Sequence, residues 1–218
     1  MIVAIDGLAG SGKSSTAKLV ASRLGFSYFT TGKMYRAITK YAIMNNLIGN
    51  LPESIEKVID EINISVKGTN FNEIIINNSN YSNDLYSEKI NQYIGILSSV
   101  ASIRAKMVKI QREVAKNNNI VCEGRDIGTV VFPNADYKFY FKADLKSRTD
   151  RRYLEIKKKN PSLEKSSLRN MIKNRDYRDL NRKESPLKKA DDAILVLTTN
   201  MTIVEQVNFI CDIVEDDK

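Results

Sequence analysis

A glycine-rich motif near the start of the chain most restricts what it can fold into. The stretch "GLAGSGKS", Gly7 to Ser14, matches G-x-x-x-x-G-K-[ST] at every position. It follows Ile2–Ile5, a short apolar run typical of a buried strand in a parallel sheet. After it, apolar residues recur at the spacing of one helix face: Ala17, Val20, Ala21 and Leu24. A strand, a glycine loop and a helix therefore follow one another.

This order is the context in which such a loop binds phosphate. Glycines let successive backbone N–H groups turn inward around an anion, and the helix start adds its dipole. Lys13 reaches β- and γ-phosphates, and the Ser14 hydroxyl is a candidate magnesium ligand. A plain glycine-rich turn is the alternative. We expect nine residues to bind a nucleoside triphosphate: Gly7, Leu8, Ala9, Gly10, Ser11, Gly12, Lys13, Ser14 and Ser15.

Strand-like and helical segments alternate along the rest of the chain. Further strands are predicted at "FSYFT", "NNNIVC", "ADYKFYFKA" and "AILVL", the last as a buried strand. Helices are predicted at 31–46, 52–62, 87–117 with a break near Ser98–Ser99, 145–159, 163–180, and after a Thr202–Glu205 capping box. The alternation predicts an α/β doubly wound fold.

One segment interrupts this alternation. The stretch "INISVKGTNFNEIIINN" changes to strand periodicity and predicts two strands around the turn "KGTN". We interpret 61–85 as part of an insertion within a single domain spanning 1–218.

Composition limits the chemistry further. With 218 residues the chain forms one large domain, or a core domain with insertions. It has no apolar run of membrane-spanning length and no signal-peptide pattern, so we expect a cytoplasmic protein. Cys122 and Cys211 are expected to be free, buried core residues. The absence of histidine excludes His-based acid–base chemistry.

The net charge of +8 fits either nucleic acid or a small polyanion held by arginines. Arginines gather at Arg36, in "EGRD", in "RTDRR" and in "NRDYRDLNR". The first two follow predicted strands, whose carboxyl ends bind ligands in open α/β sheets. Arg175, Arg178 and Arg182 lie on one helical face, interleaved with aspartates, which suits a compact anion better than a long backbone.

Phosphoryl transfer explains such a distribution, because its catalysis is positioning and charge stabilisation. A GTPase is disfavoured because the chain contains no Asn-Lys pair for an N-K-x-D signature. Structural alternatives stay open. "RTDRR" also fits a solvated helix face, "NRDYRDLNR" a set of intrahelical salt bridges, and Arg125–Asp126 a structural pair.

Together with the P-loop, the segments "TGKMYRA", "EGRDIGTVVFPNADYKFYFKA", "RTDRR" and "NRDYRDLNR" closely resemble bacterial cytidylate kinases over essentially the whole chain. The resemblance implies a P-loop NTPase-type three-layer fold with a five-stranded parallel core sheet. It also implies a small NMP-binding insertion with a β-hairpin and a helical lid at about 145–165. The implied reaction is ATP plus CMP or dCMP giving ADP plus CDP or dCDP, with Mg²⁺, by a monomer that needs no nucleic acid or membrane.

The resemblance also assigns residues. Lys13 and the lid arginines Arg148, Arg151 and Arg152 would be catalytic, and Ser14 would bind the metal. The CMP-binding set would be Thr31, Tyr35, Arg36, Arg104, Arg125, Asp126, Arg175, Asp179 and Arg182. Arg36, Arg125 and Arg182 match arginines on the CMP phosphate, Arg104 one at the base, and Arg175 with Asp179 a pair at the ribose. Asp126 matches an aspartate that reads the cytosine amino group; a carboxylate accepts from that N4–H₂ and repels the uracil O4.

The chain departs from the family pattern at four places. Thr30-Thr31-Gly32 precedes "MYR" where an acidic residue is common, and Leu8 stands where proline is common. Gly95 aligns with a serine that contacts cytosine, for which Ser98 or Ser99 is a substitute, and Leu197 takes an acidic position. Two alternatives to a CMP kinase remain: a kinase for UMP, AMP or shikimate, and a nucleotide-dependent nucleic-acid binder.

Overall fold

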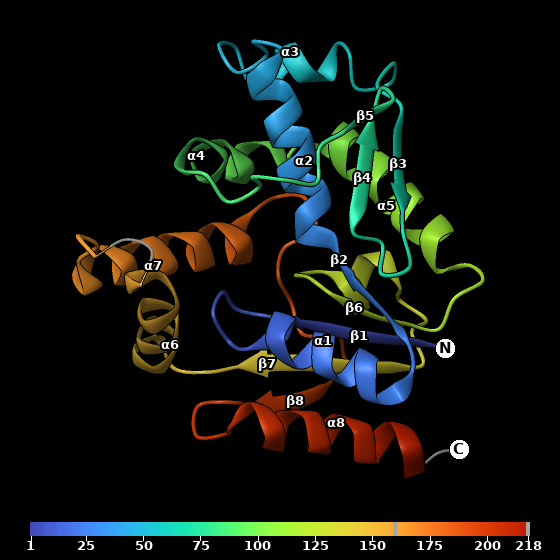
Figure 1. Ribbon diagram of the computed structural model, residues 1–218, viewed down its shortest axis with the longest axis vertical. Helices are drawn as coiled ribbons and strands as arrows, with labels where there is room; N and C mark the ends of the chain where they lie inside the picture. Colours follow the sequence, from blue (N-terminus) through green and yellow to red (C-terminus); the bar gives the residue numbers. More distant parts are fainter. Residues whose placement is uncertain (159–160, 217–218) are drawn as a thin grey trace. The chain divides into compact units, whose positions relative to one another are not determined.

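The computed structural model describes residues 1–158 and 161–216. Its central feature is a five-stranded parallel sheet in the order β2-β6-β1-β7-β8 (Figure 1). The strands are β1 (Ile2–Gly7), β2 (Ser27–Thr30), β6 (Ile120–Glu123), β7 (Tyr137–Lys142) and β8 (Ile194–Leu197). The predicted fold class is confirmed, and each of the five predicted strands forms part of this sheet. In its register β1 pairs Gly7 with Phe141 of β7.

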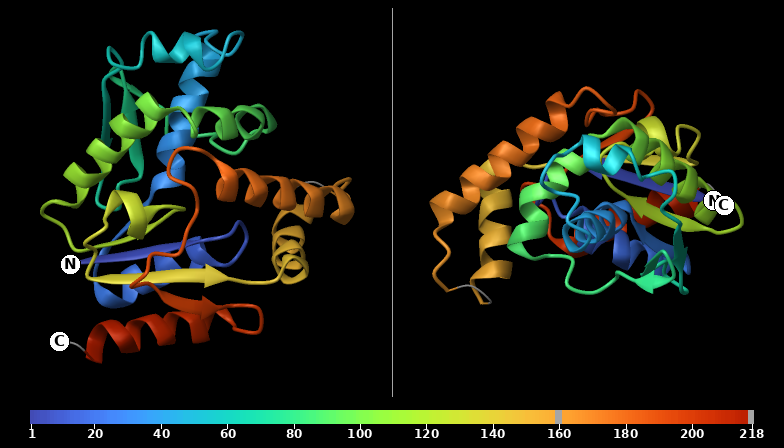
Figure 2. Two further views of the ribbon diagram at one scale, coloured as in Figure 1. Left: turned by 180° about the vertical axis from the view of Figure 1, so that it is seen from behind. Right: turned by 90° about the horizontal axis from the view of Figure 1, so that it is seen from above.

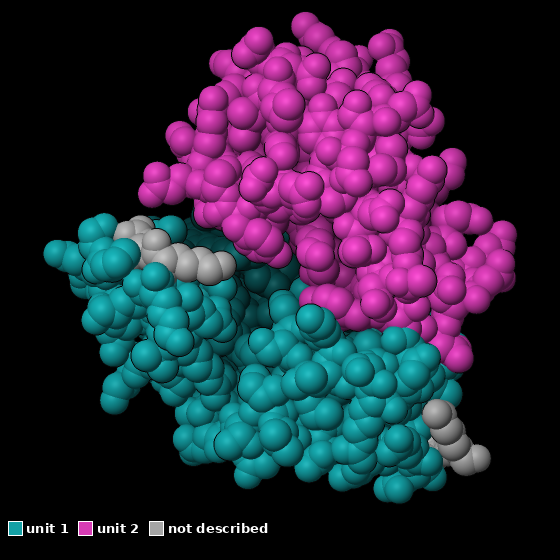
Figure 3. All heavy atoms as spheres, viewed as in Figure 1, with its two compact units in different colours: residues 1–26, 121–218 teal, residues 27–120 magenta. Residues whose placement is uncertain are grey.

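The chain divides into two compact units, coloured separately in Figure 3. Unit 1 comprises Met1–Phe26 and Val121–Lys218, and unit 2 comprises Ser27–Ile120. The helices of unit 1 are α1 (Lys13–Leu24), α6 (Leu145–Lys157), α7 (Lys165–Asn181) and α8 (Ile203–Asp216). In this unit α1 packs beside α8, and α6 packs beside α7 (Figure 2). Within the described residues, no helix is both long and apolar enough to cross a membrane.

Unit 2 contains α2 (Thr31–Met44), α3 (Glu53–Glu56), α4 (Glu88–Leu97), α5 (Ala101–Ala115) and a three-stranded sheet. The predicted hairpin is confirmed as β3 (Ile64–Lys67) paired antiparallel with β4 (Glu73–Ile76). A short third strand, β5 (Ser79–Asn80), was not predicted. The predicted break between α4 and α5 lies at Ser98–Val100.

The helix predicted over 52–62 is wrong beyond Glu56. Turns closed mainly by i→i−3 hydrogen bonds replace the α-helix: the N–H of Val58 donates to Ile55 O and that of Ile62 to Ile59 O, beside an i→i−4 bond from Ile59 N–H to Ile55 O. Ile55, Ile59 and Ile62 are nevertheless buried. Successive tight turns keep the same apolar stripe inward, so the hydrophobic pattern did not distinguish them from a helix.

The prediction that "AILVL" forms a buried strand is also wrong. In β8 only Val196 is buried, whereas Ile194, Leu195 and Leu197 are 36%, 45% and 61% exposed. The sheet order places β8 at the edge, where it pairs with β7 alone. An apolar run does not reveal whether a strand is central or at the edge, because that is set by topology.

Other details agree with the sequence. In the Thr202–Glu205 capping box, the Thr202 N–H donates to Glu205 Oε2 (2.7 Å) and the Glu205 N–H donates to Thr202 Oγ1 (3.2 Å). Cys122 and Cys211 are free and fully buried, as expected. The predicted end of a helix at Lys159 lies outside the described residues, and α6 ends at Lys157.

Candidate active site

The glycine-rich loop joins β1 to α1 in unit 1. Gly7 and Gly12 have φ values of +142° and +97°, which L side chains rarely adopt. A Cβ on Gly7 would lie 2.1 Å from the Phe141 carbonyl oxygen, so the loop also needs glycine where it passes β7. The first turn of α1 carries no acidic residue and its N-cap, Gly12, has no side chain to cap it. The positive end of the helix is therefore available to an anion.

Lys13 lies within this loop and is only 4% exposed. Its Nζ donates to the Leu8 carbonyl oxygen at 2.7 Å and to Ser11 Oγ at 3.4 Å. Burial, and then the positive charge of Arg125, hold the pKa of Lys13 well below its usual value, against the attraction of Glu123. An anion bound in the loop would raise the pKa of Lys13 and stabilise its charged form, so the site favours a phosphate next to Lys13.

Ser14 begins the helical side of the loop and faces a carboxylate. Its Oγ donates to Glu123 Oε1 at 3.0 Å, at the end of β6. Among the described residues, no group of three or more histidine, cysteine or acidic residues is arranged so that it could hold a metal ion. Mg²⁺ in phosphoryl-transfer sites uses one or two protein oxygens together with phosphates and water. The Ser14 hydroxyl and the nearby Glu123 carboxylate fit that requirement.

Asp6 is a buried acid that the sequence interpretation missed. Its carboxylate accepts from the backbone N–H of Ile127 (2.8 Å) and of Gly128 (2.7 Å). These residues start the π-helical turn Ile127–Val131 that follows "GRD". Burial raises the pKa of Asp6 to about 6, and the two N–H bonds oppose the rise. The signal was an acid at the end of an apolar strand, one residue before the motif.

Arginines and aspartates predicted to bind CMP meet between the end of β6 and α7. Arg125 Nε lies 2.8 Å from Asp179 Oδ2, and Arg175 Nε lies 3.9 Å from the same oxygen. Arg182 Nη2 lies 3.3 Å from Asp126 Oδ1. The structure therefore brings together five of the residues predicted to bind CMP. Arg175–Asp179 is a salt bridge within α7, of the kind predicted for "NRDYRDLNR".

Electrostatics in this cluster favour the charged forms. Burial acts against ionisation of both Arg125 and Asp179, but their mutual attraction outweighs it. The pKa of Arg125 is raised and the pKa of Asp179 is lowered. The Arg125–Asp179 pair therefore stays ionised at neutral pH and presents fixed charges to a ligand.

The three predicted lid arginines lie in different surroundings. Arg148 is buried and bonds to the Asp176 carboxylate and to the carbonyl oxygens of Ala9 and Ala143. Arg151 Nη2 donates to carbonyl oxygens in the loop after β8, at Thr198 and at Thr199 (3.0 Å).

Arg152 is different, because its side chain is 45% exposed and pairs with Glu155 of its own helix at 2.7 Å. The alternative of a solvated helix face therefore describes Arg152, and does not describe Arg148 or Arg151.

The remaining predicted residues belong to unit 2. Thr31 begins α2, which also carries Tyr35 and Arg36. Arg36 Nη1 donates to Leu85 O and to Asn91 Oδ1, both at 2.9 Å. Arg104, on α5, donates to Ser98 O at 3.1 Å, and its guanidinium lies 5.7 Å from the centre of the Tyr35 ring.

Both serines proposed as substitutes at Gly95 bond locally. Ser98 Oγ donates to Gly95 O at 3.3 Å and Ser99 Oγ donates to Ile96 O at 2.7 Å. Both hydroxyl protons are therefore used in hydrogen bonds to backbone carbonyl oxygens of α4. These bonds do not orient either hydroxyl toward a ligand.

Gln206 and Thr198 are two further polar residues that the sequence did not flag. Gln206 is fully buried; its Oε1 accepts from Thr16 Oγ1 (2.7 Å) and its Nε2 donates to Met201 O (3.1 Å). Thr198 Oγ1 donates to Ser11 O at 2.9 Å. Thr198 therefore ties the loop after β8 to the glycine-rich loop, and Gln206 ties α8 to α1 across 190 positions of sequence.

A phosphate-binding loop at the carboxyl end of a central parallel strand, with its buried lysine and a nearby cluster of arginines, defines a P-loop protein of the nucleotide-kinase type. The cytidylate kinase family model matches residues 3–216. The chain belongs to the cytidylate kinase family.

Relatives agree with this assignment. The chain is 43% identical to a cytidylate kinase of Fusobacterium nucleatum subsp. nucleatum over 100% of this chain and 99% of that protein. It is 41% identical to a cytidylate kinase of Clostridium botulinum, with 99% and 98% of the two chains covered. A crystal structure of an uncharacterized protein from Eubacterium ventriosum has a TM-score of 0.52 at 13% identity, covering 99% and 98%, and shares the fold.

Proposed function

We propose that this protein transfers the γ-phosphoryl group of ATP to CMP or dCMP, giving ADP and CDP or dCDP. The observation that carries the proposal is the full-length match to the cytidylate kinase family. The charge pattern of unit 1 supports it, because a P-loop and a paired arginine–aspartate cluster are present in the same unit.

The donor half of the reaction is assigned to the glycine-rich loop. Backbone N–H groups of Gly7–Ser15 would hold the ATP phosphates, and Lys13 would leave the Leu8 carbonyl to contact the β- and γ-phosphates. Mg²⁺, held through Ser14 with Glu123 nearby, would neutralise charge on the phosphates. Arg148, Arg151 and Arg152 are proposed to stabilise the transferred group.

The acceptor half is assigned to the cluster of unit 1 and to four residues of unit 2. Arg125 and Arg182 would hold the CMP phosphate, and Arg175 with Asp179 would bind the ribose. Asp126 would accept from the cytosine amino group. Thr31, Tyr35, Arg36 and Arg104 are the proposed contributions of unit 2. A CMP phosphate oxygen then attacks the γ-phosphorus, and ADP leaves.

The finer organisation is also a proposal. Residues 61–85 would belong to the NMP-binding insertion of one kinase domain, and about 145–165 to a lid that excludes water during transfer. The protein is proposed to work in the cytoplasm as a monomer.

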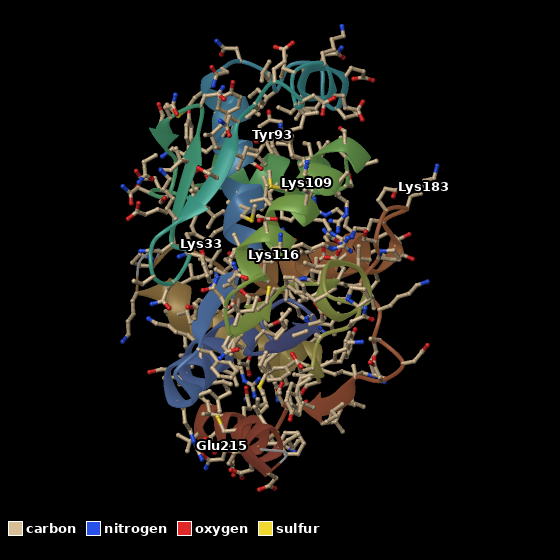
Figure 4. All side chains as sticks on the ribbon, turned by 90° about the vertical axis from the view of Figure 1, so that its right-hand side faces the viewer. Lys33, Tyr93, Lys109, Lys116, Lys183 and Glu215 are labelled. Atoms are coloured by element: carbon tan, nitrogen blue, oxygen red, sulfur yellow. The ribbon has the colours of Figure 1, made fainter. Side chains whose placement is uncertain are left out.

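A nucleotide-dependent nucleic-acid binder is the competing proposal. It requires a basic face that follows a long backbone. Of the exposed lysines labelled in Figure 4, Lys109 and Lys116 come from α5 and its C-terminal end, and Lys183 comes from the segment after α7. The pairing of Arg125 with Asp179 and of Arg182 with Asp126 suits a compact anionic ligand better than a long backbone, which favours the kinase.

The decisive experiment measures ADP production from ATP and Mg²⁺ with CMP, dCMP, UMP and AMP offered in parallel. Turnover of CMP and dCMP at much higher kcat/KM than the other two supports the proposal. Faster turnover of UMP or AMP would contradict the base assignment. No turnover with any acceptor, together with salt-dependent binding to DNA or RNA, would support the competing proposal.

A further inference from the structure

Ala9, in the middle of the glycine-rich loop, is attached to the helices α6 and α7. Its side chain is 6% exposed and packs in an apolar cluster with Leu168 and Ile172 of α7. Partly buried apolar residues pack against the cluster: Leu145, Tyr153, Ile156 and Leu163. The loop therefore has a hydrophobic anchor outside its own motif.

The peptide groups of Ala9 are bound by the same helices. Its N–H donates to Asp176 Oδ1 at 3.1 Å, and its carbonyl oxygen accepts from Arg148 Nη1 at 3.0 Å. Arg148 Nη1 also pairs with Asp176 Oδ2. One carboxylate thus holds the loop with one oxygen and holds Arg148 with the other.

These groups lie in a low-dielectric environment. The side chains of Arg148 and Asp176 are 6% and 10% exposed. Arg148 Nε donates to Ala143 O at 2.9 Å, in the residue that follows β7. Hydrogen bonds to charged groups in such surroundings are strong, and their geometry is fixed by packing.

The neighbouring loop residue is equally close to α6. A Cβ on Gly10 would lie 3.3 Å from Arg148 O and 3.4 Å from Arg148 Cβ. The backbone of α6 therefore lies against the loop at Gly10.

We propose that Asp176 is a positioning residue for the donor nucleotide, a role that rests on the proposed function. It fixes the backbone of the P-loop at Ala9 and orients Arg148 beside that loop. Asp176 also lies between Arg175 and Asp179 on α7, the helix that carries the proposed acceptor-binding residues. The donor loop and the acceptor helix are thereby fixed to each other through one carboxylate.

The test compares Asp176→Asn with Asp150→Asn. Asp150 also joins α6 to α7, through an ion pair with Lys165 at 2.8 Å, but the side chains of this pair are 39% and 53% exposed. Each variant is measured for its Tm, for ADP affinity by titration calorimetry with Mg²⁺, and for kcat and KM with ATP and CMP.

Asp176→Asn is expected to weaken ADP binding and raise the KM for ATP by about tenfold, because the amide keeps one acceptor oxygen but loses the negative charge that pairs with Arg148. Asp150→Asn should change both by less than about twofold. An Asp176→Asn protein with a lowered Tm but unchanged ADP affinity and KM for ATP would overturn the proposal, since the residue would then serve stability alone.

A double variant covers the case in which Asp176→Asn does not fold. Combining it with Arg148→Gln removes the uncompensated buried charge, so the Tm is expected to recover toward that of the wild type. The ADP affinity should stay about tenfold weaker. Recovery of wild-type ADP affinity in this variant would overturn the proposal. Failure of the wild type to phosphorylate CMP would instead reject the proposed function, and the ADP titrations would still report on Asp176.

Discussion

The hydroxyl of Ser14 donates a hydrogen bond of 3.0 Å to Oε1 of Glu123, across 109 positions of sequence. It joins the first turn of α1 to the end of β6. The contact places a carboxylate beside the hydroxyl assigned to the metal, so a bound cation would meet two oxygen donors from separate elements.

Replacing Ser14 by alanine should therefore raise the Mg²⁺ concentration needed for half-maximal activity by about tenfold, because one donor is lost. The independent readout is Mg²⁺-dependent ADP affinity by calorimetry. Ser22→Ala, an exposed change later in α1, is the control. If Ser14→Ala keeps the wild-type Mg²⁺ dependence, the Ser14 assignment is wrong.

Lys13→Ala should nearly abolish phosphoryl transfer, lowering kcat by about a thousandfold, because the cation at the β- and γ-phosphates is removed. Lys18→Ala, an exposed lysine on the same helix, should leave kcat unchanged. Initial rates of ADP formation with saturating CMP provide the measurement. Retention of most activity by Lys13→Ala would contradict the P-loop assignment.

Asp6 should make stability depend on pH in a defined window. Burial raises its pKa from 3.8 to about 6, so the folded protein binds this proton more tightly than the unfolded chain. Its contribution to the free energy of unfolding is fully present below pH 4 and is lost as the pH rises through 6, by up to about 3 kcal/mol.

Urea unfolding of wild type and Asp6→Asn from pH 4 to pH 7 measures this contribution. The wild type should lose stability relative to the variant as the pH rises, and the difference should level off above pH 7. A difference between the two proteins that stays constant across this range would show that the pKa of Asp6 is not raised.

Asp126→Asn should change base selectivity. Its amide can donate to the O4 of uracil, whereas the carboxylate repels that oxygen. The ratio of kcat/KM for UMP over CMP is expected to rise at least about tenfold. Asp191→Asn, on an exposed turn, is the matched control. An unchanged ratio would mean that Asp126 does not contact the base.

Gly95→Ser should lower the KM for CMP by about threefold, since it restores the hydroxyl that the family pattern places there. The substitution is structurally mild because Gly95 lies within α4, where serine is a better helix former than glycine. Gly49→Ser, which meets no atom within 4 Å of the added Cβ, is the control. A raised or unaltered KM would contradict the role assigned to this position.

Much of the fold followed from local pattern. The P-loop, the strand–helix alternation, the hairpin around Gly68 and the Thr202–Glu205 capping box each depend on residues within a few positions of one another. The exceptions are informative. The stripe Ile55, Ile59 and Ile62 fits tight turns as well as a helix, and "AILVL" fits an edge strand as well as a buried one, because hydropathy does not encode hydrogen-bond spacing or sheet position.

In the candidate site, too, local residues and long-range contacts play different parts. Contiguous residues are sufficient to identify the phosphate loop and the family, because the motif is local and its backbone conformation is set by its own glycines. The residues that surround that loop come together through long-range folding. Asp6 and Ile127 are 121 positions apart, and Ala9 and Asp176 are 167 apart. Such pairs form because the parallel sheet brings the ends of distant strands to one edge, and no local periodicity records which side chains will meet there.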